Sequence, residues 1–289
     1  MQKIIQSVLI IFFASSMVLF LISLWNQNKN RDQQGPVITM TEKAVKISVK
    51  DDASAILNGV TAIDQKDGDV TESLVVESLS NFIEKGRRQA TIAAFDQDNH
   101  VTKVTREVIY TDYHSPHFSL EEPLRFSING HESLLENVTV SDVLDGDISG
   151  NMTINQNDNA IYTDLEPGYY TYTISVVNSA GDIAQLPVTI ELYAPTQDSQ
   201  CPRVVLSDYL IYIKRGTDLN PSDYIEGILL GGRSYSMDAL PDDFSYTADD
   251  IHISNPVDSD TPGVSEIVYT MKNKDDEQSQ IRLIVVVEE

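Results

Sequence analysis

Apolar and polar residues alternate along most of the chain after residue 36. Val45, Ile47 and Val49 alternate with lysine and serine, and segment 170–176 repeats the alternation with tyrosine, isoleucine and valine. A period of two in β-branched and aromatic residues predicts strands with one buried face. Turn residues recur at short intervals, and no convincing helical periodicity follows the first segment. The pattern therefore predicts an all-β chain built from sandwiches.

A different pattern occupies the first residues, where an apolar run of 22 residues covers 4–25 and no charged residue occurs from Ile4 to Asn28. A helix of this length spans about 30 Å of hydrocarbon. The run exceeds the usual core of a cleaved signal peptide, about 7–15 residues, and no small-x-small cleavage pattern follows it. We expect an uncleaved signal anchor, a single transmembrane helix over residues 4–25. Residues 1–3 would form a cytoplasmic tip and residues 26–35 a polar linker.

Two stretches repeat after the linker. "VTAIDQKDGDVT" covers residues 60–71, and "VTVSDVLDGDIS" covers residues 138–149. A closing pattern of glycine, strand, polar turn and strand occurs three times, from Gly86, Gly168 and Gly263. Self-similarity of this kind predicts a duplicated module. Proline-containing linkers set the predicted domains at 36–113, 114–195 and 200–289.

These motifs resemble the bacterial immunoglobulin-like domain of the pesticidal-crystal-protein type. "GYYTYTISVVNSAGDIA" resembles the closing hairpin of that family, although Asn178 and Asp182 exchange its usual aspartate and asparagine. The resemblance covers 36–289 and is weakest in the third unit, which lacks Asp-Gly-Asp. It implies three tandem immunoglobulin-like β-sandwich domains on a bacterial protein, with the N-terminus inside and the repeats extracytoplasmic. It implies no particular ligand.

The net charge of the chain restricts its possible binding partners. The chain carries 44 acidic and 20 basic residues, which gives a formal net charge of −24. A field of this sign repels nucleic acid, so we expect no nucleic-acid partner. The single cysteine, Cys201, excludes an internal disulfide.

The repeated Asp-x-x-Asp-Gly-Asp supplies the candidate metal ligands, because calcium takes six to eight oxygen ligands and carboxylates around a glycine turn can converge on one ion. An EF-hand is excluded, since its twelfth position from Asp64 falls on Val75. Turn stabilisation by aspartate side chains is the alternative. The loss of the motif from the third unit favours that alternative and leaves calcium open. The candidate calcium ligands are Asp64, Asp67, Asp69, Asp142, Asp145 and Asp147.

Two further groups of residues have a chemical and a structural interpretation. His114 and His117 in "HSPH" could begin a zinc site, but they lack an identifiable third ligand and are expected to be solvated linker residues. The tyrosines of the third unit could form a recognition face for a glycan or a protein, or could fill strand positions in the core and at the edge. These tyrosines are Tyr209, Tyr212, Tyr224, Tyr235 and Tyr246.

No catalytic motif is present: the sequence has no G-x-S-x-G, no H-E-x-x-H, no phosphate-binding glycine loop and no Cys–His pair. We therefore expect neither an enzyme nor catalytic or cofactor-binding residues. The favoured hypothesis is a bacterial surface protein, anchored in the cell membrane through residues 4–25. Its modules would form a stalk that displays a binding or adhesion surface for a protein or glycan. The alternative is a structural spacer or assembly subunit of a cell-envelope complex.

Overall fold

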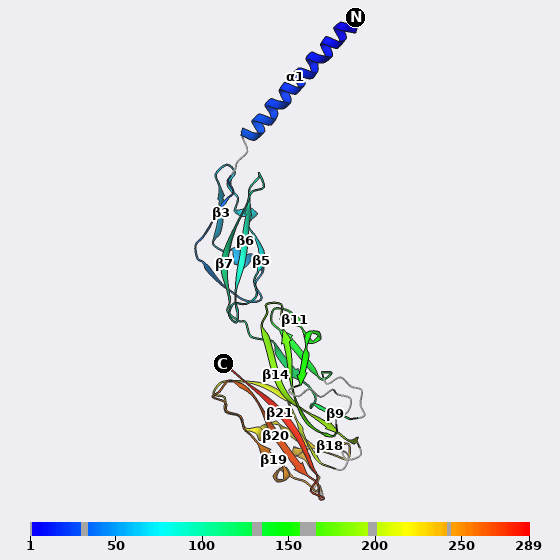
Figure 1. The fold of residues 1–289 in the computed structure, drawn as a ribbon. Helices are drawn as coiled ribbons and strands as arrows, with labels where there is room; N and C mark the ends of the chain where they lie inside the picture. Colours follow the sequence, from blue (N-terminus) through cyan, green and yellow to red (C-terminus); the bar gives the residue numbers. More distant parts are fainter. Residues whose placement is uncertain (1, 30–33, 129–134, 157–165, 196–200, 242–243) are drawn as a thin grey trace. The chain divides into compact units, whose positions relative to one another are not determined.

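The structure is a computed structural model that describes residues 2–29, 34–128, 135–156, 166–195, 201–241 and 244–289. The chain divides into two compact units, Met1–Tyr113 and His114–Glu289 (Figure 1). The first unit contains helix α1 and one β-module, and the second unit contains two further β-modules. We call these the first, second and third modules in chain order.

Helix α1 covers Gln2–Lys29. Its large apolar side chains between Leu9 and Trp25 are 44–72% exposed. The side chains of residues 2–5, 7–8 and 26–29 lie outside the described residues, as do Met1 and most of the predicted linker. Among the described residues, no helix is both long and apolar enough to cross a membrane. The structure thus contains the predicted helix and does not support the membrane span predicted over 4–25.

The first module has seven strands in two sheets. Val60, Ala62 and Asp64 are buried in β3 while the residues between them are exposed, as the alternating sequence predicts. The three-stranded sheet has the order β1-β3-β4 and the four-stranded sheet the order β2-β7-β6-β5. The strands are β1 Val37–Met40, β2 Ala44–Ile47, β3 Val60–Asp64, β4 Gly68–Asp69, β5 Val75–Leu79, β6 Arg87–Phe95 and β7 Val101–Tyr110.

The second module repeats this arrangement strand for strand. Its three-stranded sheet has the order β11-β10-β8 and its four-stranded sheet the order β12-β13-β14-β9. The burial pattern of β10 is the same as that of β3. The strands are β8 His117–Leu120, β9 Arg125–Ser127, β10 Val138–Asp142, β11 Gly146–Asp147, β12 Thr153–Gln156, β13 Gly168–Val177 and β14 Ile183–Tyr193.

The third module keeps the seven strands although it lacks the Asp-Gly-Asp sequence. Its sheets have the orders β15-β17-β18 and β16-β21-β20-β19. A four-residue strand, β18, stands where the other two modules have a two-residue strand. The strands are β15 Arg203–Leu206, β16 Leu210–Lys214, β17 Ile225–Leu230, β18 Arg233–Ser236, β19 His252–Ser254, β20 Gly263–Lys272 and β21 Gln278–Glu288.

The same pairing rule closes all three modules. The first strand of each module pairs antiparallel with the third, and the second strand pairs parallel with the last. One apolar core lies between the two sheets of each module, centred on Ile92, Ile174 and Ile267. Sandwiches of three plus four mostly antiparallel strands have the strand number of immunoglobulin-like domains. The all-β sandwich prediction is confirmed, while the exact domain boundaries stay predictions.

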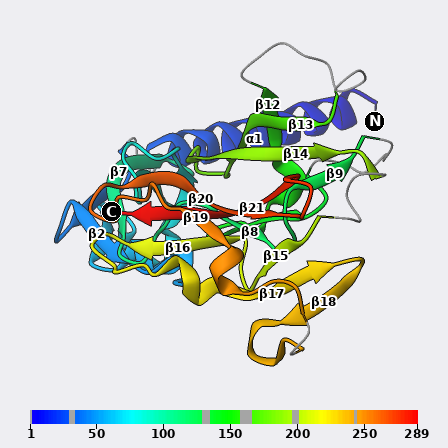
Figure 2. The same ribbon diagram turned by 90° about the horizontal axis from the view of Figure 1, so that it is seen from below.

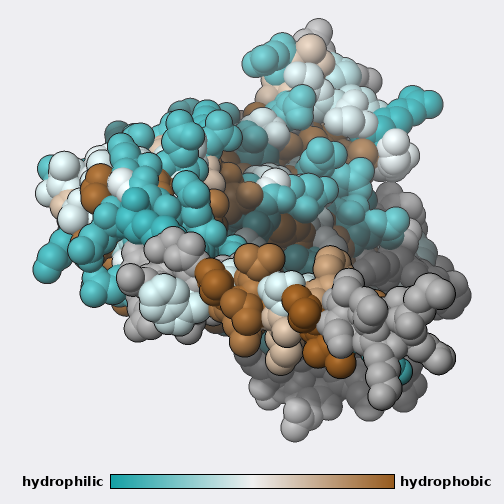
Figure 3. All heavy atoms as spheres, turned by 90° about the horizontal axis from the view of Figure 1, so that it is seen from above, coloured by the Kyte–Doolittle hydropathy of each residue, from teal (hydrophilic) through white to brown (hydrophobic). Residues whose placement is uncertain are grey.

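Polar surface dominates the face drawn in Figure 3, where hydrophobic side chains gather in small groups. Figure 2 shows β14 of the second module running beside β20 and β21 of the third, and β17 and β18 forming a separate layer. The second and third modules therefore share a packed boundary within the second unit.

Gly227 in β17 marks a close approach of two backbones. A Cβ atom at this position would lie 2.3 Å from the carbonyl oxygen of Tyr235 on β18. We predict that Gly227→Ala destabilises the third module by about 1–3 kcal/mol, because the strands must move apart. Urea unfolding of the full chain measures this effect. Gly150→Ala is the control, since no atom lies within 4 Å of a Cβ built there; an equal loss in both variants would contradict the prediction.

Candidate functional site

The repeated aspartate motif forms a tight turn between two strands in each of the first two modules. Asp64 ends β3, is 3% exposed, and its Oδ1 accepts hydrogen bonds from the backbone N–H groups of Lys66 and Asp67, both at 2.8 Å. Gly68 then takes a φ of 78°, which side-chain-bearing residues rarely adopt. The first aspartate thus organises the turn, and the glycine permits its left-handed step.

The second copy has the same geometry. Oδ1 of Asp142 accepts from the N–H groups of Leu144 and Asp145 at 2.8 and 3.0 Å, and Gly146 has a φ of 73°.

The last aspartate of each motif is exposed to solvent. Hydrogen bonds from the side chain and backbone of Ser149 lower the pKa of Asp147 below its ordinary value. In the first copy, hydrogen bonds from the side chain and backbone of Thr71 lower the pKa of Asp69 in the same way.

The middle aspartate of each motif joins the turn to the last hairpin of its own module. Oδ2 of Asp67 accepts from the N–H of Gln97 at 2.8 Å. Asp145 accepts from the N–H and the hydroxyl of Ser179, both at 2.6 Å. The fold therefore brings the aspartate turn against the β6–β7 turn and the β13–β14 turn.

The β6–β7 turn carries two more acidic side chains. Asp96 is 8% exposed, and its carboxylate accepts from the backbone N–H of His100 at 2.7 Å and lies 2.6 Å from Nδ1 of His100. Asp98 forms an ion pair with Lys66. Within the described residues, no three or more histidine, cysteine or acidic side chains are arranged to hold a metal ion. All six candidate ligands serve as hydrogen-bond acceptors in the turns, and calcium binding stays a prediction.

The histidines of the first linker have a structural setting that differs from the expectation of solvated residues. His114 stacks on His117 at 4.2 Å between ring centroids, and His117 stacks on Tyr212 of β16 at 4.1 Å. Nε2 of His117 lies 2.9 Å from Oε1 of Glu288. His114 and His117 are half-buried because they pack where the second and third modules meet.

The tyrosines of the third module do not gather on one exposed face. Tyr212 accepts a hydrogen bond from the backbone N–H of Phe118, and burial raises its pKa to about 12. Tyr235 packs on Phe244 with ring centroids 4.4 Å apart. The other three, Tyr209, Tyr224 and Tyr246, pack against the apolar core of the third module. Their placement agrees with the core-and-edge interpretation.

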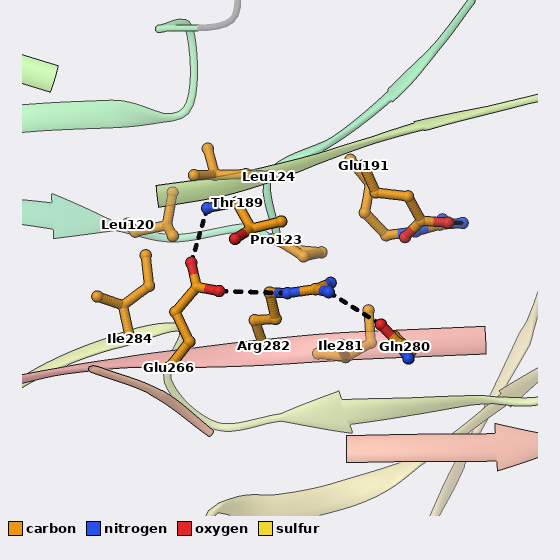
Figure 4. A pocket seen from close by; sticks show the side chains of 11 residues that line it. Leu120, Pro123, Leu124, Thr189, Glu191, Glu266, Gln280, Ile281, Arg282 and Ile284 are labelled. Atoms are coloured by element: carbon orange, nitrogen blue, oxygen red, sulfur yellow. Dashed lines mark hydrogen bonds and ion pairs between the residues drawn. The ribbon is translucent and has the colours of Figure 1, made fainter. Parts of the chain in front are cut away.

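A small cavity lies at the boundary of the second and third modules (Figure 4). Glu266 of β20 accepts from the N–H of Thr189 on β14 at 2.6 Å, and its other oxygen lies 3.3 Å from Nε of Arg282. The cavity has a volume of about 20 Å³, which holds about one water molecule. Its charged residues therefore join two modules and leave no space for a ligand.

The outer face of the third module's larger sheet is hollowed. Cross-strand pairing aligns His252 with Thr270, and Thr270 with Gln280, so one row of polar side chains crosses β19, β20 and β21. The hollow is open to solvent and has a volume of about 630 Å³. Its lining residues are Asp250, His252, Ser254, Val268, Thr270, Lys272, Gln278 and Gln280.

Sequence reasoning missed this hollow, although one signal was present. In β20, Val268, Thr270 and Lys272 alternate with buried Ile267, Tyr269 and Met271. That alternation assigns the first set to the outer face of a sheet. It does not indicate which residues of other strands lie beside them.

No known family model matches the chain, and no curated protein does. Among solved structures, one is a CBM51-2 domain in complex with GlcNAc and INT domains of Clostridium perfringens ZmpB, at 14% identity, over 52% of this chain and 26% of that one, with a TM-score of 0.22. Another is the extracellular domain of protocadherin GammaB4, at 11% identity, over 89% of this chain and 49% of that one, also with a TM-score of 0.22.

The chain thus spans about half or less of the length of these two proteins. Likenesses at this TM-score support no conclusion about ligand or activity. The class of protein rests on the strand order itself: the chain carries three seven-stranded β-sandwich modules of one topology.

Asp142 offers a direct test of the turn. We predict that Asp142→Ala destabilises the second module by about 2–4 kcal/mol, because two backbone N–H groups and the side-chain amide of Asn178 lose a buried acceptor. Chemical denaturation of the full chain measures the change. Asp147→Ala is the control in the same turn, since its carboxylate is exposed. A larger effect of the control would rule out the role given to Asp142.

Proposed function

We propose that this chain is a non-enzymatic bacterial surface protein that presents a glycan-binding face on its third module. The hollow on the β19–β20–β21 sheet carries the proposal, because it is open to solvent, has a volume of about 630 Å³ and is lined from three neighbouring strands. The two preceding modules have the same topology and would serve as a stalk. We also propose that these modules are immunoglobulin-like domains of the pesticidal-crystal-protein type, which their sequence motifs resemble.

The chemistry of the lining favours a ligand rich in hydroxyl groups. Drug-like ligand pockets are mostly apolar with a few polar groups, whereas seven of the eight residues that line this hollow are polar and Val268 is the exception. Gln278 and Gln280 each offer an amide donor and acceptor, and Thr270 offers a hydroxyl. Sugar hydroxyls both donate and accept, so they match this mixed set. A polar protein surface is the competing ligand in the test below.

Two variants test the glycan face. His252→Ala with Thr270→Ala removes neighbouring polar groups from the hollow, and Gln185→Ala removes the residue at the equivalent position of Gln280 in the second module. On an array of bacterial and host glycans, the full chain should bind at least one glycan. The double variant should bind it about thirtyfold more weakly, because two hydrogen bonds are lost at roughly 1 kcal/mol each, and Gln185→Ala should bind normally.

The array has two unfavourable outcomes. Absence of glycan binding by the unaltered chain overturns the glycan assignment, and a protein partner would then be sought. Equal weakening by Gln185→Ala would place the binding face outside the third module.

Attachment to the bacterial cell membrane is the second part of the proposal, with the N-terminus inside and the modules outside. Its support is the uncharged run over 4–25 and the high exposure of the apolar side chains from Leu9 to Trp25. Exposed apolar surface of this extent is unfavourable in water and favourable in hydrocarbon.

Charged substitutions test the attachment. Ile11→Lys with Leu19→Lys should release the chain from the membrane fraction, because each lysine costs about 2.5–3.5 kcal/mol at the centre of a spanning helix. Gln6→Lys is the control, since a long side chain near a helix end can extend to the interface. Retention of the double variant in carbonate-washed membranes would exclude anchoring through this helix.

A further inference from the structure

The first and second modules differ at one buried position beside the aspartate turn. In the second module, Asn178 begins the β13–β14 turn and is 5% exposed. Its Oδ1 accepts from two backbone N–H groups of its own turn, and its Nδ2 donates to Oδ2 of Asp142 at 3.1 Å. Both carboxylate oxygens of the buried Asp142 therefore have donors.

The first module has Asp96 at the position of Asn178. Asp96 keeps the backbone role, since its Oδ1 accepts from the N–H of His100, but a carboxylate has no amide to donate. The partner of this position is Asp64, the equivalent of Asp142. Oδ2 of Asp64 is buried and has no hydrogen-bond partner. Oδ1 of both aspartates accepts from the same two turn positions, so we infer that Oδ2 of Asp64 is directed toward Asp96 as Oδ2 of Asp142 is toward Asn178.

A buried carboxylate oxygen without a donor or a counter-charge is costly. The two basic side chains of these turns already bond to carboxylates. His100 bonds to Asp96, and Lys66 pairs with Asp98. The second module solves the same problem with the neutral amide of Asn178. In the first module, the carboxylate of Asp96 replaces that amide and cannot donate a hydrogen bond. The module therefore has two acidic side chains, Asp64 and Asp96, at these positions, and Oδ2 of Asp64 has no donor.

We propose that the first module binds one calcium ion between Oδ2 of Asp64 and the carboxylate of Asp96, and that the second module binds none. Calcium accepts carboxylates together with backbone carbonyls and water. Within the described residues no third acidic or histidine side chain completes such a group, so carbonyls and water supply the other ligands. A site with two carboxylates belongs with the weak extracellular class, with a Kd of about 10⁻⁴–10⁻³ M. This calcium site in the first module is independent of the glycan face proposed on the third module.

Hydrogen–deuterium exchange of the full chain in detergent tests the site, with 10 mM calcium chloride compared with EDTA. Calcium should slow exchange about tenfold in peptides covering 60–71 and 96–100, because that concentration is about ten times a Kd of 10⁻³ M. Peptides covering 138–149 should not respond. Absence of any calcium response in 60–71 overturns the proposal.

Three variants identify the ligands. Asp96→Asn reproduces the arrangement of the second module, so it should fold and lose the calcium response. Asp69→Asn removes the same charge from the exposed part of the same turn and should keep the response. Asn178→Asp should create a response in 138–149. A response that survives Asp96→Asn, or that disappears with Asp69→Asn, would overturn the assignment to Asp64 and Asp96.

Discussion

In each of the first two modules, the hydrogen bonds of one buried aspartate organise the turn that joins the two sheets at one end. Asp64 and Asp142 end the central strand of the smaller sheet and use one oxygen to fix the turn that follows. That turn then bonds to the last hairpin of the larger sheet through Asp67 or Asp145. A short polar motif thereby connects the two sheets at one end, while the apolar core connects them along their length.

The third module reaches the same topology without this motif. It has Asn220 as the cap of the short helix Pro221–Tyr224, where the side chain accepts from Ser222, and it has a longer β18. The smaller sheet can therefore form without the aspartate turn. The larger sheet of the third module keeps the same strand order as in the other two modules. Divergence of the third module is concentrated between β17 and β20, next to the polar hollow.

Packing between the second and third modules fixes the position of the hollow relative to the second module. Ile284 of β21 is 3% exposed and belongs to the apolar core of the second module, although its strand belongs to the third. Glu266 of the third module adds a hydrogen bond across the same boundary, from the N–H of Thr189, and is paired with Arg282 of its own module. Separating the modules would expose the apolar surface of Ile284 to water and leave the N–H of Thr189 without its acceptor. The third module is thus held by the second as a packed neighbour.

Local sequence patterns predict the strands, the repeats and the hydrogen bonding of the turns. Alternation of buried and exposed residues in 60–64 and 138–142 reflects the two-residue period of a strand, which is local and therefore visible in one dimension. The apolar run over 4–25 predicted a helix, which is present, and a membrane span, which the described residues do not support. The aspartate turns were predicted because their hydrogen bonds connect residues two or three positions apart.

Contacts between residues far apart in the sequence follow from the fold. The row of His252, Thr270 and Gln280 depends on the register of three strands, and no local pattern encodes that register. The contacts of His117 with Tyr212 and Glu288, and the burial of the unpartnered oxygen of Asp64, depend on packing between segments far apart in the chain. Local periodicity reports the environment of each residue, whereas the identity of its neighbour is set by the fold.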